Sequence, residues 1–231
     1  MPSLTSLNPF PSLKATIDLN LDDLLGWVVP APDRCRKLAD ELLAAHPEQT
    51  REQLAAKAVS SARSWAAAAG AATGIFASPL SMLPAATADA GSALRIEATL
   101  AGTVAALLDP TFDHDPVAFR ADVLTVIFPG AVSQVVRELG IKAGQTTTKA
   151  VIRRLATREF VETLTRFLSK YLGVKLTEKA VLTKTVPLVG AGIGAAWNWL
   201  EVKAVGRRAI RYFAEPNVTV RVVPPEKPTN D

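Results

Sequence analysis

Prolines divide the chain into segments that have the sequence pattern of helices. Proline is poorly tolerated inside a helix but fits the first helical turn, and several of the 16 prolines stand at the start of such a segment. The expected helices span 33–45, 48–69, 84–108, 116–139, 145–171, 177–185 and 188–214. Pro129-Gly130 should bend or break the fourth helix. Because there is neither a strand–helix alternation nor a fixed-period repeat, we predict an all-α fold, a compact multi-helix bundle with Gly/Ala-rich helical hairpins.

The helical pattern covers the middle of the chain and fades at both ends. A chain of 231 residues suits one domain. We expect a loosely ordered segment at 1–30, a single helical domain at 31–214 and a flexible tail at 215–231. The tail contains one strand-like run, 218–223, which could form an edge strand.

The apolar content depends on small residues. Hydrophobic residues make up 48% of the chain and aromatic residues only 6%. Small side chains let helices approach closely, both in or near lipid and in tightly packed soluble bundles. The net charge of +4 is compatible with contact with anionic lipid, and equally with an inert soluble protein.

Two stretches carry no charge, residues 64–88 and 185–200. A membrane-spanning helix needs roughly 20 apolar residues, so only the first stretch is long enough. Glycines and prolines interrupt it, and few of its apolar side chains are large. We therefore expect two helical pieces broken near Pro79, which pack as a hairpin or lie shallowly in a membrane interface.

The familiar catalytic motifs are absent. The chain contains no GxSxG or HExxH sequence, and residues 144–149 (GQTTTK) lack the second glycine and the preceding strand of a phosphate-binding loop. Asp113, His114 and Asp115 could hold a metal, but we favour a loop in which Asp115 caps the next helix. From the sequence we therefore predict no catalytic residue, no cofactor and no metal site.

The single cysteine, Cys35, excludes an internal disulfide and favours a reducing compartment. It lies between two arginines, and basic neighbours can lower the pKa of a thiol. Because no histidine is near in sequence, we do not expect Cys35 to be a nucleophile.

The last expected helix contains the most unusual positions. Gly190 and Gly194 share one helix face, and Asn198 follows four residues later on the same ridge. Trp197 and Trp199 flank the asparagine. Asn198 could hydrogen-bond a neighbouring backbone and fix the helix packing, which we favour, or it could make a direct functional contact.

The second half of this helix is basic. Tryptophans favour the headgroup level of a membrane, and each cation near an anionic surface contributes on the order of 1 kcal/mol. A solvated helix face is an equally good interpretation of the charges. The candidate membrane or anion contacts are Trp197, Trp199, Lys203, Arg207, Arg208 and Arg211.

Asp89 is the other unusual polar residue. It lies at helical spacing with Ala93, Ile96 and Leu100 on an apolar stripe. A carboxylate in such a place needs a partner or a raised pKa. We favour a buried structural hydrogen bond over a functional acid.

The chain resembles the EcsC protein family in these two regions. The C-terminal pattern consists of Pro187, Gly190, Gly192, Gly194 and Asn198, followed by Gly206, Ala209 and Phe213, and the N-terminal pattern consists of Gly70, Gly74 and Asp89. The likeness covers roughly residues 50–215. This chain has Leu107-Leu108-Asp109-Pro110 where many family members have a Tyr-Gly pair. The resemblance implies an all-helical, membrane-associated bacterial domain and implies no particular reaction.

These patterns support a peripheral membrane domain or an accessory protein of a membrane transporter as the first hypothesis. Its partner would be anionic lipid or the transporter. The first twenty residues show no secretory signal, so we expect the protein in the cytoplasm, at the inner face of the cytoplasmic membrane. The alternative is a soluble helical scaffold.

An enzyme is the third hypothesis, and it lacks an activated nucleophile with its base. A nucleic-acid partner is not expected, because the arginines around Arg153 come without a recognition motif.

Overall fold

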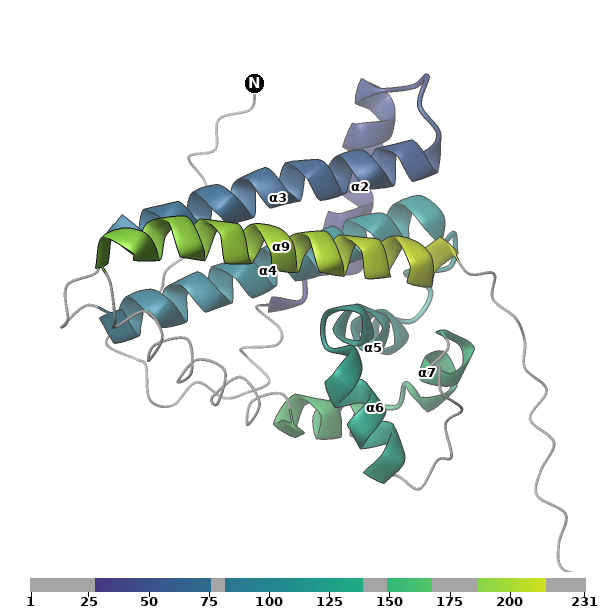
Figure 1. Ribbon diagram of the computed structural model, residues 1–231. Helices are drawn as coiled ribbons and strands as arrows, with labels where there is room; N and C mark the ends of the chain where they lie inside the picture. The colour runs from purple at the N-terminus through teal and green to yellow at the C-terminus, as the bar shows by residue number, and fades with distance from the viewer. Residues whose placement is uncertain (1–27, 76–81, 139–148, 168–186, 215–231) are drawn as a thin grey trace, which may run out of the picture.

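The computed structural model confirms the all-α prediction (Figure 1). It describes residues 28–75, 82–138, 149–167 and 187–214, and within them it leaves out the side chains of 70–75, 82–90, 187–194 and 197. The helices are α2 Pro32–Ala45, α3 Arg51–Ile75, α4 Met82–Leu108, α5 Pro116–Ile127, α6 Pro129–Glu138, α7 Lys149–Leu155, a helix at 158–167, and α9 Pro187–Ala214. The expected helix at 177–185, the break near Pro79, residues 1–27 and the tail at 215–231 lie outside the described residues. The end of the segment expected to be loosely ordered is described, and there Val28 and Val29 are buried in the core.

Three long helices form the main layer of the bundle. Helix α9 packs most extensively on α3, and both pack on α4 (Figure 1). Asn198 contacts Ala66 and Gly206 lies against Val59. Rising numbers along α9 thus meet falling numbers along α3, so these two helices run antiparallel.

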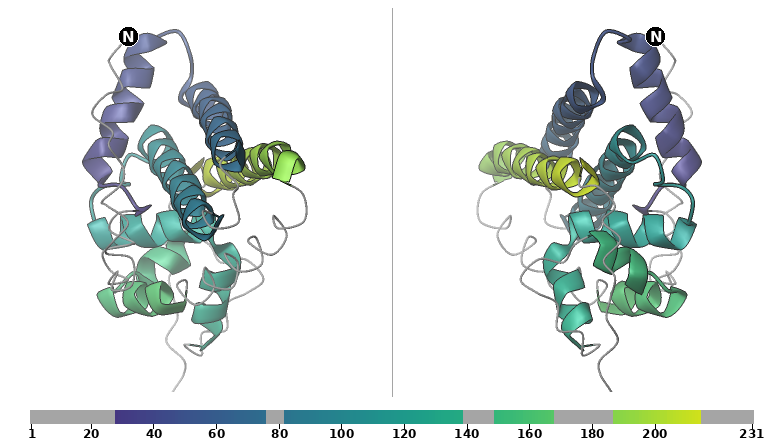
Figure 2. Two further views of the ribbon diagram at one scale, coloured as in Figure 1. Left: turned by 90° about the vertical axis from the view of Figure 1, so that its left-hand side faces the viewer. Right: turned by 90° about the vertical axis from the view of Figure 1, so that its right-hand side faces the viewer.

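The other helices flank this layer on two sides. Helix α2 packs against α4, away from α9 (Figure 2). Helices α5, α6 and α7 and the helix at 158–167 form a second group, which α5 joins to α4 and α9. The bend predicted at Pro129-Gly130 is present, because α5 and α6 meet at an angle of 117°. One hydrophobic core cluster includes residues from Val28 to Phe213.

Capping side chains explain where several helices begin. The Asp115 prediction is confirmed, because its Oδ1 accepts a hydrogen bond of 2.8 Å from the Val117 backbone N–H and Pro116 takes the first helical position. Helix α2 begins at Pro32, one residue before the predicted start, and Asp33 lies inside its first turn, where the helix dipole favours a negative charge.

Two helix boundaries differ from the prediction because of capping threonines. Thr50 and Gln53 form a capping box, in which each backbone N–H donates to the other side chain, and α3 therefore begins at Arg51 rather than near residue 48. The helix expected at 145–171 is interrupted after α7. Thr157 accepts a hydrogen bond from the Phe160 N–H and starts a separate helix at 158–167.

Candidate functional site

Asn198 faces the interior of the bundle. It is buried, and its Nδ2 donates a hydrogen bond of 3.5 Å to the backbone oxygen of Ala66 on α3. This geometry agrees with the favoured interpretation, in which Asn198 fixes helix packing. A buried amide without partners would cost about 1–3 kcal/mol, so the contact ties α9 to one axial position on α3.

Gly206 lies two turns further along the same face of α9 and permits a close approach to α3. A Cβ atom built at Gly206 would lie 2.5 Å from Cγ2 and 2.6 Å from Cγ1 of Val59. Only a residue without a side chain fits there. Val202, Val205 and Ala209 are buried beside it, which fixes the inward face of α9.

The opposite face of α9 carries a basic stripe, which we define as Lys203, Arg207 and Arg211. Arg207 and Arg211 are exposed and Lys203 is partly exposed. None of the three forms an ion pair within the described part of the chain. Leu200, 56% exposed, continues the stripe toward the helix N-terminus.

Arg208 does not belong to this stripe. Its guanidinium reaches α5 and donates a hydrogen bond of 3.4 Å to the backbone oxygen of Ile127, at the C-terminal end of that helix. Burial lowers its pKa, although the charges of Glu97 and Glu201 act in the opposite direction. The sequence analysis lists Arg208 among the candidate membrane or anion contacts, and that role stays a prediction. Arg208 faces α5 and not the stripe because the next residue along a helix points about 100° away.

Trp199 lies between the inward face and the basic stripe, with two cations over its ring. The guanidinium carbon of Arg63 on α3 is 3.7 Å from the ring centroid, and Nζ of Lys203 is 5.1 Å from it.

The remaining predicted positions belong to described helices, but the structure does not describe the surroundings of their side chains. Asp89 is in α4, and Pro187, Gly190, Gly192, Gly194 and Trp197 are in α9.

The environments of Cys35 and Asp113 indicate structural roles. Cys35 is completely buried, and this burial raises the pKa of its thiol to about 12, against a smaller opposite effect of Arg34. A thiol with that pKa is not a nucleophile at neutral pH. Asp113 pairs with Arg36 of α2, and the described residues contain no group of three or more His, Cys, Asp or Glu side chains placed to hold a metal.

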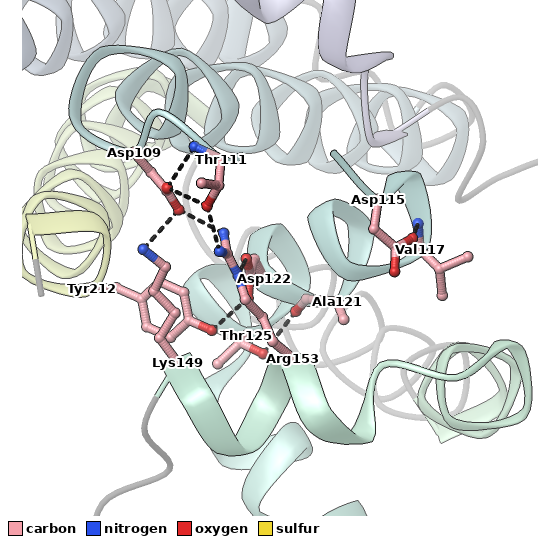
Figure 3. A network of polar contacts seen from close by, with 10 residues as sticks. All are labelled: Asp109, Thr111, Asp115, Val117, Ala121, Asp122, Thr125, Lys149, Arg153 and Tyr212. Carbon is pink, nitrogen blue, oxygen red and sulfur yellow. Dashed lines mark hydrogen bonds and ion pairs between the residues drawn. The ribbon is translucent and has the colours of Figure 1, made fainter. Parts of the chain in front are cut away.

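A buried charge network, which the sequence analysis missed, joins Asp109, the residue after the end of α4, to α5, α7 and α9 (Figure 3). The carboxylate of Asp109 accepts from Lys149 at 2.6 Å and from Arg153 at 2.5 Å. Arg153 also donates through Nε to Asp122 at 2.8 Å, and the hydroxyl of Tyr212 donates to the other oxygen of Asp122 at 2.6 Å. We call these five residues the charge network.

The charge network is balanced and hydrogen-bonded. Two carboxylates face two cations, and the side chains of Asp109, Asp122 and Lys149 are at most 4% exposed. Thr111 completes the shell of Asp109, because its backbone N–H and its hydroxyl both donate to Oδ1. Buried ions are retained when their partners satisfy them, so this geometry suits a structural clamp between the two groups of helices.

Comparison with protein families, curated proteins and solved structures gives no match to this chain. The resemblance to the EcsC family therefore stays a prediction.

The two carboxyls of the charge network have pKa values displaced in opposite directions. Burial is the largest influence on each and favours the neutral form. At Asp122 burial prevails and raises the pKa above its ordinary value of 3.8, despite the charge of Arg153 and the hydrogen bond from Tyr212. At Asp109 the hydrogen bonds from Lys149 and Thr111 and the charge of Arg153 outweigh burial, so the pKa is lowered.

These displacements predict opposite pH dependences for two asparagine variants. The contribution of Asp122 to the free energy of unfolding is full below pH 3.8 and is lost as the pH rises through its raised pKa. The contribution of Asp109 is present above pH 3.8 and is lost as the pH falls through its lowered pKa. The difference in the free energy of unfolding between wild type and Asp122→Asn should therefore decrease with rising pH. The corresponding difference between wild type and Asp109→Asn should increase.

Urea unfolding of the three proteins between about pH 3 and pH 8, followed by circular dichroism, measures both differences. The exposed Asp115→Glu variant would control for general acid effects, because it keeps a carboxylate at the helix cap. Two differences that change in the same direction would contradict the assignment of the two pKa displacements.

Proposed function

We propose that the protein binds anionic membrane surfaces peripherally through the outward face of α9. The observation that carries the proposal is the basic stripe. Lys203, Arg207 and Arg211 lie four residues apart, point away from the core, and have no anionic partner within the described residues. The resemblance to the EcsC family supports the same proposal.

The rigidity of α9 favours binding to a flat surface. Asn198 and Gly206 hold its inward face against α3, so the cations are presented without ordering a loop. Exposed Leu200 lies in the same face and could enter the boundary between headgroups and acyl chains. Apolar contact of this kind combines with electrostatic attraction in interfacial helices.

Peripheral contact does not require a membrane-spanning helix. By length and composition, one described segment, Gly91–Leu108 in α4, could cross a membrane. Taken together, α5 and α6 also have the length and composition of a membrane-spanning segment that is broken by the bend between them. Because α2, α3 and α9 surround α4, the segment has the environment of a core helix in the structure described here.

A soluble scaffold is the second candidate function. It is favoured by the finding that Asn198 and Gly206, two positions of the glycine-rich pattern, form internal contacts with α3. An accessory protein of a membrane transporter would use the same basic stripe toward a protein partner instead of lipid.

Co-sedimentation with vesicles tests the membrane proposal. We expect binding to vesicles that contain phosphatidylserine, little binding to neutral phosphatidylcholine, and loss of binding at high salt. Changing Lys203, Arg207 and Arg211 to glutamine should weaken binding at low salt at least tenfold, since each cation contributes on the order of 1 kcal/mol.

The matched control removes three exposed cations from other helices, through Arg34→Gln, Lys37→Gln and Arg154→Gln. It has the same net charge as the stripe variant and should bind nearly as well as wild type. Equal weakening of both variants would show that net charge, and not the stripe, governs binding. No binding of wild type to anionic vesicles would eliminate the membrane proposal and favour the scaffold.

A further inference from the structure

Two cations from different helices converge on one aromatic ring at the edge of the basic stripe. Arg63 comes from α3, whereas Trp199 and Lys203 come from α9. The guanidinium carbon of Arg63 is 3.7 Å and Nζ of Lys203 is 5.1 Å from the Trp199 ring centroid, so the two cations are no further apart than the sum of these distances. Attraction to the ring face offsets only part of their mutual repulsion.

Neither cation has an anionic partner in the described part of the chain. The ion pairs found there use other residues, and Nε of Arg63 is buried without a hydrogen-bond partner among the described residues. An anion bound beside Trp199 would pair with both cations and relieve the repulsion between the two positive charges.

We infer that Arg63 and Lys203 bind the phosphomonoester headgroup of a membrane lipid. The inference rests on the proposed membrane function and names the lipid class. Two adjacent cations match a group that carries two negative charges. A phosphomonoester carries about −1.5 to −2 at neutral pH and offers three acceptor oxygens, whereas a phosphodiester or a carboxylate carries one charge.

The position of the pair favours a lipid over a soluble phosphate. Leu200 follows Trp199 directly and is exposed, and Arg207 lies one turn beyond Lys203. The phosphate would therefore be bound where an apolar side chain and a further cation face the same surface. The guanidinium of Arg63 can donate two parallel hydrogen bonds to phosphate oxygens, and Lys203 adds a second positive charge.

The test compares vesicles of equal surface potential that contain either phosphatidylserine or phosphatidic acid. Wild type should bind phosphatidic acid vesicles about tenfold more tightly. Arg63→Gln should remove this preference and leave phosphatidylserine binding nearly unchanged. Lys203→Gln should also remove the preference, and it provides an independent test at a more exposed position if Arg63→Gln is poorly folded. Arg211→Gln, the control on the same helix, should weaken binding to both lipids equally.

The outcomes separate this inference from the proposed function. Equal binding of wild type to both vesicles overturns the phosphomonoester site and leaves peripheral binding intact. Absence of binding to either vesicle overturns both. Binding of inorganic phosphate by wild type as tight as its binding of phosphatidic acid vesicles, and lost in Arg63→Gln, would assign the site to free phosphate and overturn the lipid assignment. A preference that survives in both Arg63→Gln and Lys203→Gln would place lipid recognition elsewhere in the chain.

Discussion

Replacing Asp109 by asparagine is expected to lower the free energy of unfolding by about 3–5 kcal/mol at neutral pH. The variant keeps the shape of the side chain but leaves Lys149 and Arg153 without the carboxylate that they share at 2.6 and 2.5 Å. Removing one partner of a buried ion pair is costly because the remaining charge stays desolvated. Urea denaturation monitored by circular dichroism at 222 nm measures the loss.

Asp113→Asn is the matched control for this prediction. It makes the same chemical change four residues further along the chain, in the Arg36 pair, where the arginine side chain is 48% exposed. Its effect should be much smaller, because solvent screens exposed pairs. The double variant Asp109→Asn/Lys149→Met should recover part of the loss by removing the stranded cation. Equal losses in Asp109→Asn and Asp113→Asn would refute the clamp role of the charge network.

Replacing Gly206 by alanine is expected to lower the free energy of unfolding by about 1–3 kcal/mol, although alanine favours helix formation over glycine by about 1 kcal/mol. The added methyl group would lie 2.5 Å from Val59 Cγ2. Because Val59 is β-branched and stiff at χ1, the conflict has to be relieved by moving α9 away from α3. Thermal and urea unfolding measure the change.

The compensating variant Val59→Ala should be less harmful in the Gly206→Ala background than in wild type, which a double-mutant cycle would report as a favourable coupling. Gly130→Ala serves as the reference substitution. Gly130 lies in α6, and a Cβ atom there has nothing within 4 Å, so helix propensity alone should make this variant neutral or slightly stabilising. A stabilising Gly206→Ala would mean that α3 and α9 do not touch as closely as described.

The helices could be predicted from the sequence because prolines and capping residues act locally. Pro116 with Asp115 marked the start of α5 correctly, and the Pro129-Gly130 bend was placed correctly. The errors came from local signals that were overlooked. Thr50 and Gln53 have the spacing of a capping box, and Thr157 is a capping residue within an otherwise helical pattern.

The charge network could not be predicted, because its members are distant in sequence and meet only through the packing of four helices. One signal was available. Asp122 is followed in α5 by an uninterrupted run of buried residues, 123–127, and a charge beside such a run needs a partner. The spacing of Lys149 and Arg153, four residues apart, places both on one face of α7. Nothing in the sequence pairs that face with Asp109 or Asp122.

The basic stripe was partly predictable, because residue spacing along a helix determines which side chains share a face. Lys203, Arg207 and Arg211 share a face by spacing alone, and the same spacing excludes Arg208 from that face. The contact of Arg63 with Trp199 joins residues from α3 and α9, so only the packed bundle reveals it.

The main helix pair joins segments that are made at very different times during synthesis. Helix α3 ends at Ile75, and α9 begins at Pro187. Synthesis proceeds at roughly 5–20 residues per second on the ribosome. The alanine-lined face of α3 is therefore made many seconds before its principal partner, α9. Until then, among the described helices, α2 and α4 are the partners available to α3, and the face that α9 later covers is open to chaperones or to lipid. Because α9 covers this face of α3 and also bears the basic stripe, the nascent protein closes the α3–α9 contact and acquires its cationic surface in the same step.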